Sequence, residues 1–178
     1  MCTVRIDQTV SDPNSKVEIV QDTGFRTWLR NNTHRYLAKL TAAKQLTVCQ
    51  LEDGGGKYYY DGTHADLSGG EGEWMQIMPT LYWYCDTDDT DVVEYTFGSY
   101  KFNDNCKVYT GRAIGVAKGY VANGIMHSYA DVDVSNNYSY TNGVTYSTAR
   151  GDGFSMVLSI NHRIVGCLFY MLYESTDS

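Results

Sequence analysis

Cysteine and histidine side chains can supply nucleophiles or metal ligands, so their spacing is the first test for chemistry. The five cysteines are widely separated: Cys2, Cys49, Cys85, Cys106 and Cys167. The histidines are His34, His64, His127 and His162. This sequence has no CxxC, HxH or HExxH pattern, which predicts reduced, partly buried thiols and structural histidines. A disulfide such as Cys85–Cys106 and a Cys–His dyad formed in three dimensions stay open.

Three further kinds of sequence pattern can indicate a chemical site. The acidic run Asp86–Asp91 resembles a calcium loop, but its sixth position is Asp91 where an EF-hand has glycine, so a solvated turn is favoured. Arg150-Gly151-Asp152 is an RGD tripeptide, which we interpret as a glycine-rich turn before a strand at 154–158. Nucleophile-elbow and phosphate-loop motifs are missing from the sequence. We therefore expect no catalytic residues, no metal site and no cofactor.

Tyrosines around Asn142-Gly143 are the best candidates for ligand contact. An Asn-Gly dipeptide favours a tight hairpin, because both residues tolerate positive φ. Strands on either side of it would place aromatic rings on one face, where they can stack on sugars or proteins. The candidate ligand-binding residues are Tyr138, Tyr140, Asn142 and Tyr146. Ordinary strand tyrosines are the alternative interpretation.

The composition of the 178-residue chain excludes several classes of protein. Lys and Arg number 14 and Asp and Glu number 21, so the net charge is −7 and no basic footprint for nucleic acid exists. The sequence has no apolar run of the ~18 residues that a membrane span requires, and residues 1–10 show no signal-peptide pattern. The chain has 16 Tyr and 17 Gly against 2 Pro, which favours strands joined by tight turns.

The elements that must position these residues follow from hydrophobic spacing. Asp22 precedes Phe25, Trp28 and Leu29, which predicts a short N-terminal helix ending near Asn31-Asn32. Alternation predicts a hairpin over residues 36–49, strands at 74–79, 81–84 and 92–102, and a second hairpin around Asn123-Gly124.

The strongest helical signal lies near the C-terminus. An apolar stripe continues over four turns: Ile160, Ile164, Cys167, Leu168, Met171 and Leu172. It predicts a long, buried C-terminal helix that begins after Ser159. Two helices among many short strands define an α+β fold class.

The order of motifs along the chain resembles a known family. The motifs are Thr33–Lys39, Cys49–Asp53, Tyr60–Thr63, Gly72–Trp83, Ile114–Tyr120, Ile125–Ser128, Ala149–Val157 and Leu168–Tyr173. They are similar to fibre and receptor-binding proteins of gut Bacteroides-type phages. Members of that family have a C-type-lectin-like fold of the formylglycine-generating-enzyme type, and many are variable proteins of diversity-generating retroelements.

The resemblance implies an organisation for the chain. Residues 1–35 would be an attachment and oligomerisation segment, and residues 36–178 a C-type-lectin-like domain. In this family the last helix is usually followed by further sequence that carries the ligand-contacting positions. Here the sequence stops at Ser178, so the chain is either a shortened member or lacks its natural C-terminal end.

The resemblance also implies a function. It predicts a non-enzymatic structural protein of the virion, of fibre or receptor-binding type, that forms a homotrimer. Its partners would be other virion proteins and a bacterial surface polysaccharide or protein, with no nucleic acid and no membrane. A cell-surface lectin or pilus-tip adhesin of a gut bacterium is the alternative. An enzyme related to the formylglycine-generating family is a third hypothesis, which predicts reactive paired cysteines.

Overall fold

The chain folds into two compact units made of interleaved segments. The computed structural model describes residues 1–40, 46–52, 56–86, 91–117, 119–130, 132–133, 135, 138–151, 154–156 and 159–174. Unit 1 comprises Met1–Asn32, Pro79–Gly111 and Leu158–Ser178. Unit 2 comprises Thr33–Met78 and Arg112–Val157. The polypeptide therefore passes from one unit to the other at four points along the sequence.

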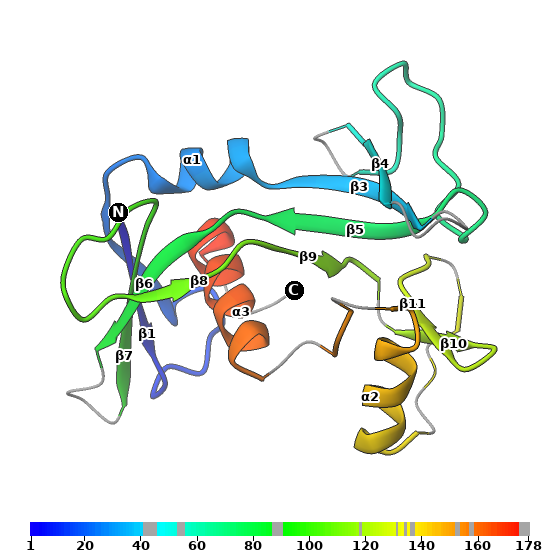
Figure 1. Ribbon diagram of the computed structural model, residues 1–178. Coiled ribbons are helices and arrows are strands. Elements are labelled where there is room, and N and C mark those ends of the chain that lie inside the picture. The colour runs from blue at the N-terminus through cyan, green and yellow to red at the C-terminus, as the bar shows by residue number, and fades with distance from the viewer. Residues whose placement is uncertain are drawn as a thin grey trace. The chain divides into compact units, whose positions relative to one another are not determined.

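Unit 1 contains a five-stranded antiparallel sheet with the strand order β2-β1-β7-β6-β8 (Figure 1). Its strands are β1 (Cys2–Asp7), β2 (Val17–Asp22), β6 (Leu81–Asp86), β7 (Val92–Gly98) and β8 (Lys107–Tyr109). Strand β1 alternates between buried and half-buried residues, so Cys2, Val4 and Ile6 enter the core. Tyr95 and Phe97 of β7 are buried as well, with their rings stacked at 6.2 Å.

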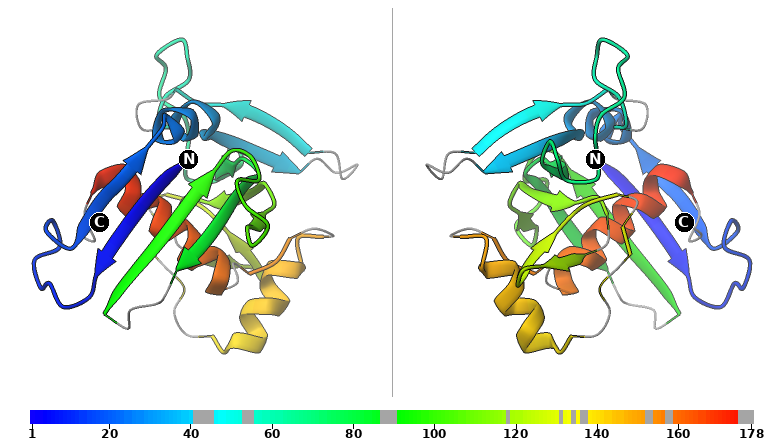
Figure 2. Two further views of the ribbon diagram at one scale, coloured as in Figure 1. Left: turned by 90° about the vertical axis from the view of Figure 1, so that its left-hand side faces the viewer. Right: turned by 90° about the vertical axis from the view of Figure 1, so that its right-hand side faces the viewer.

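The two helices of unit 1 follow the predicted spacing. Helix α3 (Ser159–Tyr173) contacts β1 and β2 and lies along the sheet in both views of Figure 2. Its buried residues repeat at helical spacing: Ile164, Cys167, Leu168 and Met171. Helix α1 (Phe25–Asn32) buries Phe25 and Leu29. The Asp22 carboxylate accepts hydrogen bonds from the N–H groups of Gly24 and Phe25, both at 2.9 Å, so it satisfies donors at the start of α1, although Gly24 rather than Asp22 occupies the N-cap position.

Helix α3 and the N-terminal residues differ in detail from what was expected. The prediction of a helix at 159–173 is confirmed, but only one face of α3 is buried among its described side chains, while His162, Arg163 and Tyr173 are exposed. Residues 1–32 belong to the packed body of unit 1, where β1 is an inner strand. The attachment role of residues 1–35 stays a prediction.

Unit 2 contains a four-stranded antiparallel sheet with the order β4-β3-β5-β9. Its strands are β3 (His34–Leu40), β4 (Leu46–Gln50), β5 (Glu73–Met78) and β9 (Arg112–Gly115). Leu37 of β3 is paired with Trp74 of β5 on one sheet face. That face carries the buried cluster Leu37, Leu51, Ala65 and Leu67, against which Tyr59, Trp74 and Ala130 pack. The predicted hairpin over residues 36–49 is confirmed.

A small hairpin follows in unit 2, made of β10 (Tyr120–Ala122) and β11 (Ile125–His127). Asn123 and Gly124 between the strands have φ of 52° and 74°. Positive φ at both central residues is the requirement of a type I′ turn, which confirms the first predicted Asn-Gly hairpin.

The second predicted Asn-Gly hairpin is wrong. Residues Tyr140–Thr148 form helix α2, so Asn142 and Gly143 lie within a helix. The Ser139 hydroxyl accepts a hydrogen bond from the Asn142 N–H at 3.3 Å and caps this helix. Gly143 faces inward, where a Cβ atom would come within 2.8 Å of the Met156 sulfur. The absent side chain lets the helix pack closely, and this contact overrides the local preference for a turn.

The remaining sequence expectations fall in loops. Residues 154–156 form no strand, and residues 157 and 158, the end of the strand expected there, lie outside the described residues. Most of the acidic run 86–91 and Asp152 of the RGD tripeptide also lie outside them. All five cysteines are free thiols, so Cys85 and Cys106 form no disulfide. Within the described ranges, none of the helices has the length and apolarity needed to cross a membrane.

Candidate functional site

Of the four predicted ligand-binding residues, two are half-buried and two are exposed. Tyr138 and Tyr146 are half-buried, and their rings meet edge to face at 6.0 Å. Tyr140 is 72% exposed at the first position of α2, and Asn142 is exposed on the same helix. The four residues therefore form no continuous row on a strand face. Whether they contact a ligand stays a prediction.

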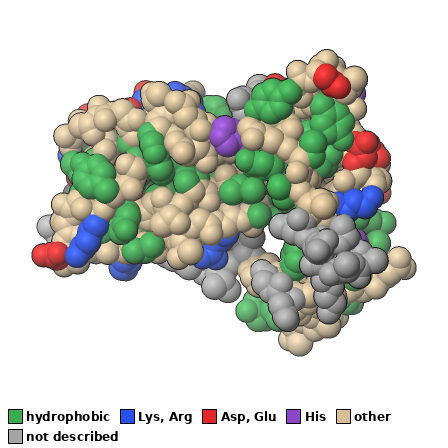
Figure 3. Space-filling view, turned by 45° about the horizontal axis from the view of Figure 1, so that its top comes forward, with side chains coloured by type: hydrophobic (Ala, Val, Ile, Leu, Met, Phe, Trp, Pro, Cys, Tyr) green, Lys and Arg blue, Asp and Glu red, His purple; other side chains and the backbone are tan. Residues whose placement is uncertain are grey.

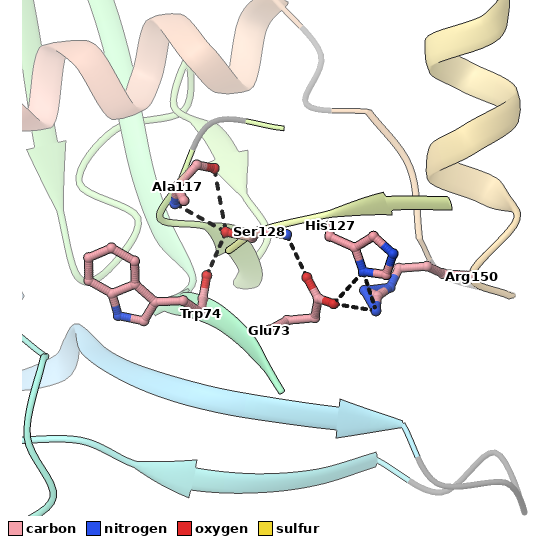
Figure 4. A network of polar contacts seen from close by, with 6 residues as sticks. All are labelled: Glu73, Trp74, Ala117, His127, Ser128 and Arg150. Carbon is pink, nitrogen blue, oxygen red and sulfur yellow. Dashed lines mark hydrogen bonds and ion pairs between the residues drawn. The ribbon is translucent and has the colours of Figure 1, made fainter. Parts of the chain in front are cut away.

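A buried polar network in unit 2 is the main site that the sequence did not indicate (Figure 4). Its centre is the carboxylate of Glu73, which is only 8% exposed. Oxygen Oε1 accepts a hydrogen bond from Arg150 Nη2 at 2.5 Å and lies 2.8 Å from His127 Nδ1. Oxygen Oε2 accepts the backbone N–H of Ser128 at 2.5 Å. The Arg150 and His127 side chains are themselves 17% and 14% exposed.

Strand β5 positions Glu73 through backbone pairing at the start of the strand. The Trp74 N–H donates to the Ser128 carbonyl at 2.9 Å, and the Val116 N–H donates to the Trp74 carbonyl at 3.0 Å. The Ser128 hydroxyl donates to the same Trp74 carbonyl at 2.8 Å and accepts the Ala117 N–H at 3.1 Å. Ser128 therefore ties three separate chain segments together beside the carboxylate.

Two tyrosine rings pack beside His127, the imidazole partner of Glu73. The Tyr129 ring stacks on His127 at 4.6 Å, and Tyr120 lies 6.1 Å from Tyr129. Burial raises the pKa of the Tyr129 hydroxyl, and the nearby negative charge of Glu73 raises it further. Gly69 has a φ of 108°, and a Cβ there would come within 2.5 Å of the Tyr129 ring. The Tyr129 ring is therefore packed closely against the backbone at Gly69.

The arrangement around Glu73 suits a structural role better than a catalytic one. Both carboxylate oxygens are already engaged by donors, and a general base needs an oxygen that can reach a substrate proton. Among the described residues, no group of three or more His, Cys, Asp or Glu side chains could hold a metal ion. The network joins β5, β11 and the segment after α2, so we interpret it as a buried polar network that stabilises unit 2.

The sequence does not reveal this network, because its partners are far apart along the chain. His127 lies 54 residues and Arg150 lies 77 residues from Glu73. One signal was present in the sequence: Glu73 is an acidic residue at the start of the apolar strand Trp74–Met78. A buried acid requires a partner, but spacing alone does not name it.

A second cluster of unit 2 joins two half-buried residues, Tyr36 and Gln50, to the exposed Tyr60. The Tyr36 hydroxyl donates to Gln50 Oε1 at 3.4 Å, and Gln50 Nε2 donates to the Tyr60 hydroxyl at 2.8 Å. We call these three residues the Tyr36–Gln50–Tyr60 cluster. Tyr58 flanks it in the chain and packs edge to face on His64 at 5.0 Å. Tyr58 and Tyr60 are 45% and 62% exposed.

Three thiols of unit 1, those of Cys2, Cys85 and Cys167, do not have the environment of activated nucleophiles. Burial raises the pKa of the Cys2 thiol to about 12 and that of Cys167 to about 11. The pKa of Cys85 is raised for the same reason. Tyr95, which acts in the opposite direction on the pKa of Cys85 and of Cys167, does not outweigh the effect of burial. A reactive thiol needs a lowered pKa, so these three thiols favour a structural role.

Comparison with known proteins gave no match to a family model, to a curated protein or to a solved structure.

Proposed function

We propose that this chain is a non-enzymatic structural protein of a virion, of fibre or receptor-binding type, which displays a C-type-lectin-like domain for recognition of a host surface. The order of motifs along the sequence supports the family resemblance, and the strand-rich α+β architecture is compatible with it. A homotrimer attached to other virion proteins is part of the proposal.

The exposed tyrosines are the observation that carries a binding function. Tyr58, Tyr60 and Tyr140 of unit 2 are all exposed, on the segment after β4 and on α2. Tyrosine offers a rigid ring and a hydroxyl at a low cost in conformational entropy, so it is frequent on recognition surfaces. The buried polar groups around Glu73, in contrast, are engaged with one another.

Electron microscopy of the native particle tests the virion proposal. Gold-labelled antibodies raised against this chain should decorate a projecting fibre, and particle-derived protein should sediment as a trimer. Labelling of a bacterial cell surface in cultures without particles would instead support the adhesin alternative. A soluble monomer associated with neither particle nor cell surface would contradict both.

Thiol reactivity tests the non-enzymatic part of the proposal. Under native conditions we expect the exposed Cys49 to react with a disulfide reagent, while Cys2 and Cys167 react only after denaturation, because both are buried and their pKa is raised. Fast reaction of Cys85 or Cys167 at neutral pH would revive the enzyme hypothesis.

A further inference from the structure

The Tyr36–Gln50–Tyr60 cluster is built as a ligand site would be, with its polar atoms held in place before binding. Gln50 lies opposite Tyr36 in the β3–β4 register, so backbone pairing fixes their separation. The amide of Gln50 is then oriented from both ends, by the Tyr36 hydroxyl and by the Tyr60 hydroxyl. In Figure 3, hydrophobic side chains, a group that includes tyrosine, gather on the segment that follows β4.

The amide of Gln50 retains hydrogen-bonding capacity. A glutamine amide has two N–H donors and two lone pairs on its oxygen. The two bonds to the tyrosines use one N–H and one lone pair. Within the described part of the chain, a second N–H and a second lone pair of Gln50 therefore remain beside the exposed ring of Tyr60. This combination of a ring face with a paired donor and acceptor suits a ligand that has both C–H faces and hydroxyl groups.

Charge restricts the kind of ligand. The segment 56–72 carries Lys57 against Asp61, Asp66 and Glu71, so its net charge is 1 − 3 = −2 with histidine neutral. The whole chain has a net charge of −7. An acidic polysaccharide would be repelled by both, whereas an uncharged sugar would not be.

We propose that the Tyr36–Gln50–Tyr60 cluster binds an uncharged saccharide unit, with the ring of Tyr60 stacked on a sugar face and the amide of Gln50 bonded to sugar hydroxyls. Tyr58, which precedes it in the same segment, provides a second exposed ring. The inference rests on the proposed recognition function and names the ligand class and the site. A protein ligand is less suitable, because a stable protein interface buries about 800 Å² on each partner, which is more than three side chains supply.

Saturation-transfer NMR and calorimetry on the full chain test the proposal. The probes are neutral oligosaccharides of glucose, galactose, mannose and N-acetylglucosamine, with polygalacturonate as the acidic comparison. We expect at least one neutral probe to bind and polygalacturonate not to bind. Tyr60→Ala and Gln50→Ala should each weaken binding at least about tenfold, and Tyr60→Phe should weaken it less, because the ring is retained.

The matched controls are exposed tyrosines of unit 1. Tyr100→Ala and Tyr173→Ala remove rings of similar exposure, 56% and 66%, and should leave saccharide affinity unchanged. Circular dichroism and thermal unfolding establish that each variant is folded. Failure of every neutral probe to bind would overturn the inference, as would binding that Tyr60→Ala and Gln50→Ala leave intact. Fibre labelling on the particle is measured separately, so the virion proposal can survive either result.

Discussion

Glu73 holds a carboxylate that is almost completely removed from water between two basic side chains. We predict that Glu73→Ala lowers the free energy of unfolding by about 3 kcal/mol, because Arg150 would then be a buried cation without its counter-charge. Urea denaturation followed by circular dichroism measures the loss. The loss comes from separating the two charges, so the variants are not additive. Glu73→Ala combined with Arg150→Met should lower the free energy of unfolding by much less than the sum of the two single variants.

Glu18 provides the control for Glu73. It also pairs with an arginine, Arg5, at 3.2 Å, but both side chains are largely exposed. An exposed pair contributes about 0 to 1 kcal/mol, so Glu18→Ala should change stability by no more than that. If Glu73→Ala and Glu18→Ala lowered the free energy of unfolding equally, the stabilising role that we assign to the buried network would be contradicted.

The contact between Tyr59 and Glu71 predicts a pH dependence of stability. The Tyr59 hydroxyl donates to Glu71 Oε2 at 2.5 Å, which lowers the pKa of Glu71 from 4.5 and raises the pKa of Tyr59 from 10.0 to about 12. The stabilisation by Glu71 is present above pH 4.5 and is lost as the pH falls through the lowered pKa. The stabilisation by Tyr59 is complete below pH 10 and is lost as the pH rises towards 12.

Comparison of the wild type with Tyr59→Phe across pH isolates this contact. The difference in unfolding free energy should be constant between about pH 5 and pH 9 and should shrink at both ends. A difference that is the same at pH 3 as at pH 7 would show that the hydrogen bond adds nothing in the folded state.

At the residue scale, the sequence revealed side chains that act locally but not those that meet across the fold. Asp22 was correctly placed before α1, because its carboxylate caps N–H groups only two and three residues away. The Glu73–Arg150 pair spans 77 residues. Its formation depends on how β5, β11 and α2 assemble, which spacing does not report.

At the element scale, two identical dipeptides adopt different structures. Asn123-Gly124 forms the tight turn of the β10–β11 hairpin, whereas Asn142-Gly143 lies in α2. The first dipeptide stands between strand residues that pair with each other. The second follows Ser139, whose hydroxyl caps a helix, and Gly143 packs inward. Local turn propensity decides the first case, and capping with packing decides the second.

Ser139→Ala tests the helical assignment of α2. We expect a loss of about 1 kcal/mol in unfolding free energy, because the Asn142 N–H would lose its side-chain acceptor. Thr141→Ala on the exposed face of the same helix should be neutral or slightly stabilising, because alanine has the higher helix propensity. In a hairpin the two substitutions would have no reason to differ in this direction, so the reverse order would contradict the helix.

The long periodic patterns predicted their elements better than the short ones. The stripe that includes Ile164, Cys167, Leu168 and Met171 indicated α3, and these four residues are buried on one face. Strands β3 and β4 also formed where alternation predicted them. Residues 140–148 are too few for a stripe to outweigh an Asn-Gly dipeptide, so the same reasoning failed there.

At the scale of the whole molecule, interleaving of segments couples the two units. When unit 2 is folded, residues 79–111 are held at both ends by their chain neighbours in unit 2, at positions 78 and 112. Closing a loop of this length before it folds removes about 3 to 4 kcal/mol of chain entropy from the unfolded segment. Unit 1 is therefore more stable when unit 2 is folded, and the same reasoning applies in reverse.

We predict that the two units unfold in one cooperative transition. Leu29→Ala in the core of unit 1 should cost about 3 kcal/mol. Amide hydrogen exchange near the denaturation midpoint should report the same decrease in the free energy of opening in both units. The decrease should be equal at Val4 and Phe97 of unit 1 and at Leu37 and Trp74 of unit 2. Unchanged protection in unit 2 would mean that the units unfold independently.

The position of α3 in the sequence has a consequence for synthesis of the chain. Strands β1 and β2 leave the ribosome first, but the helix that covers their apolar side chains is encoded after residue 158. The ribosome adds about 5 to 20 residues per second, so Cys2, Val4 and Ile6 are synthesised roughly 10 s or longer before α3 emerges. During that interval the nascent sheet presents an apolar face to the cell. Yield should therefore depend on chaperones that hold emerging chains and on slow growth at low temperature.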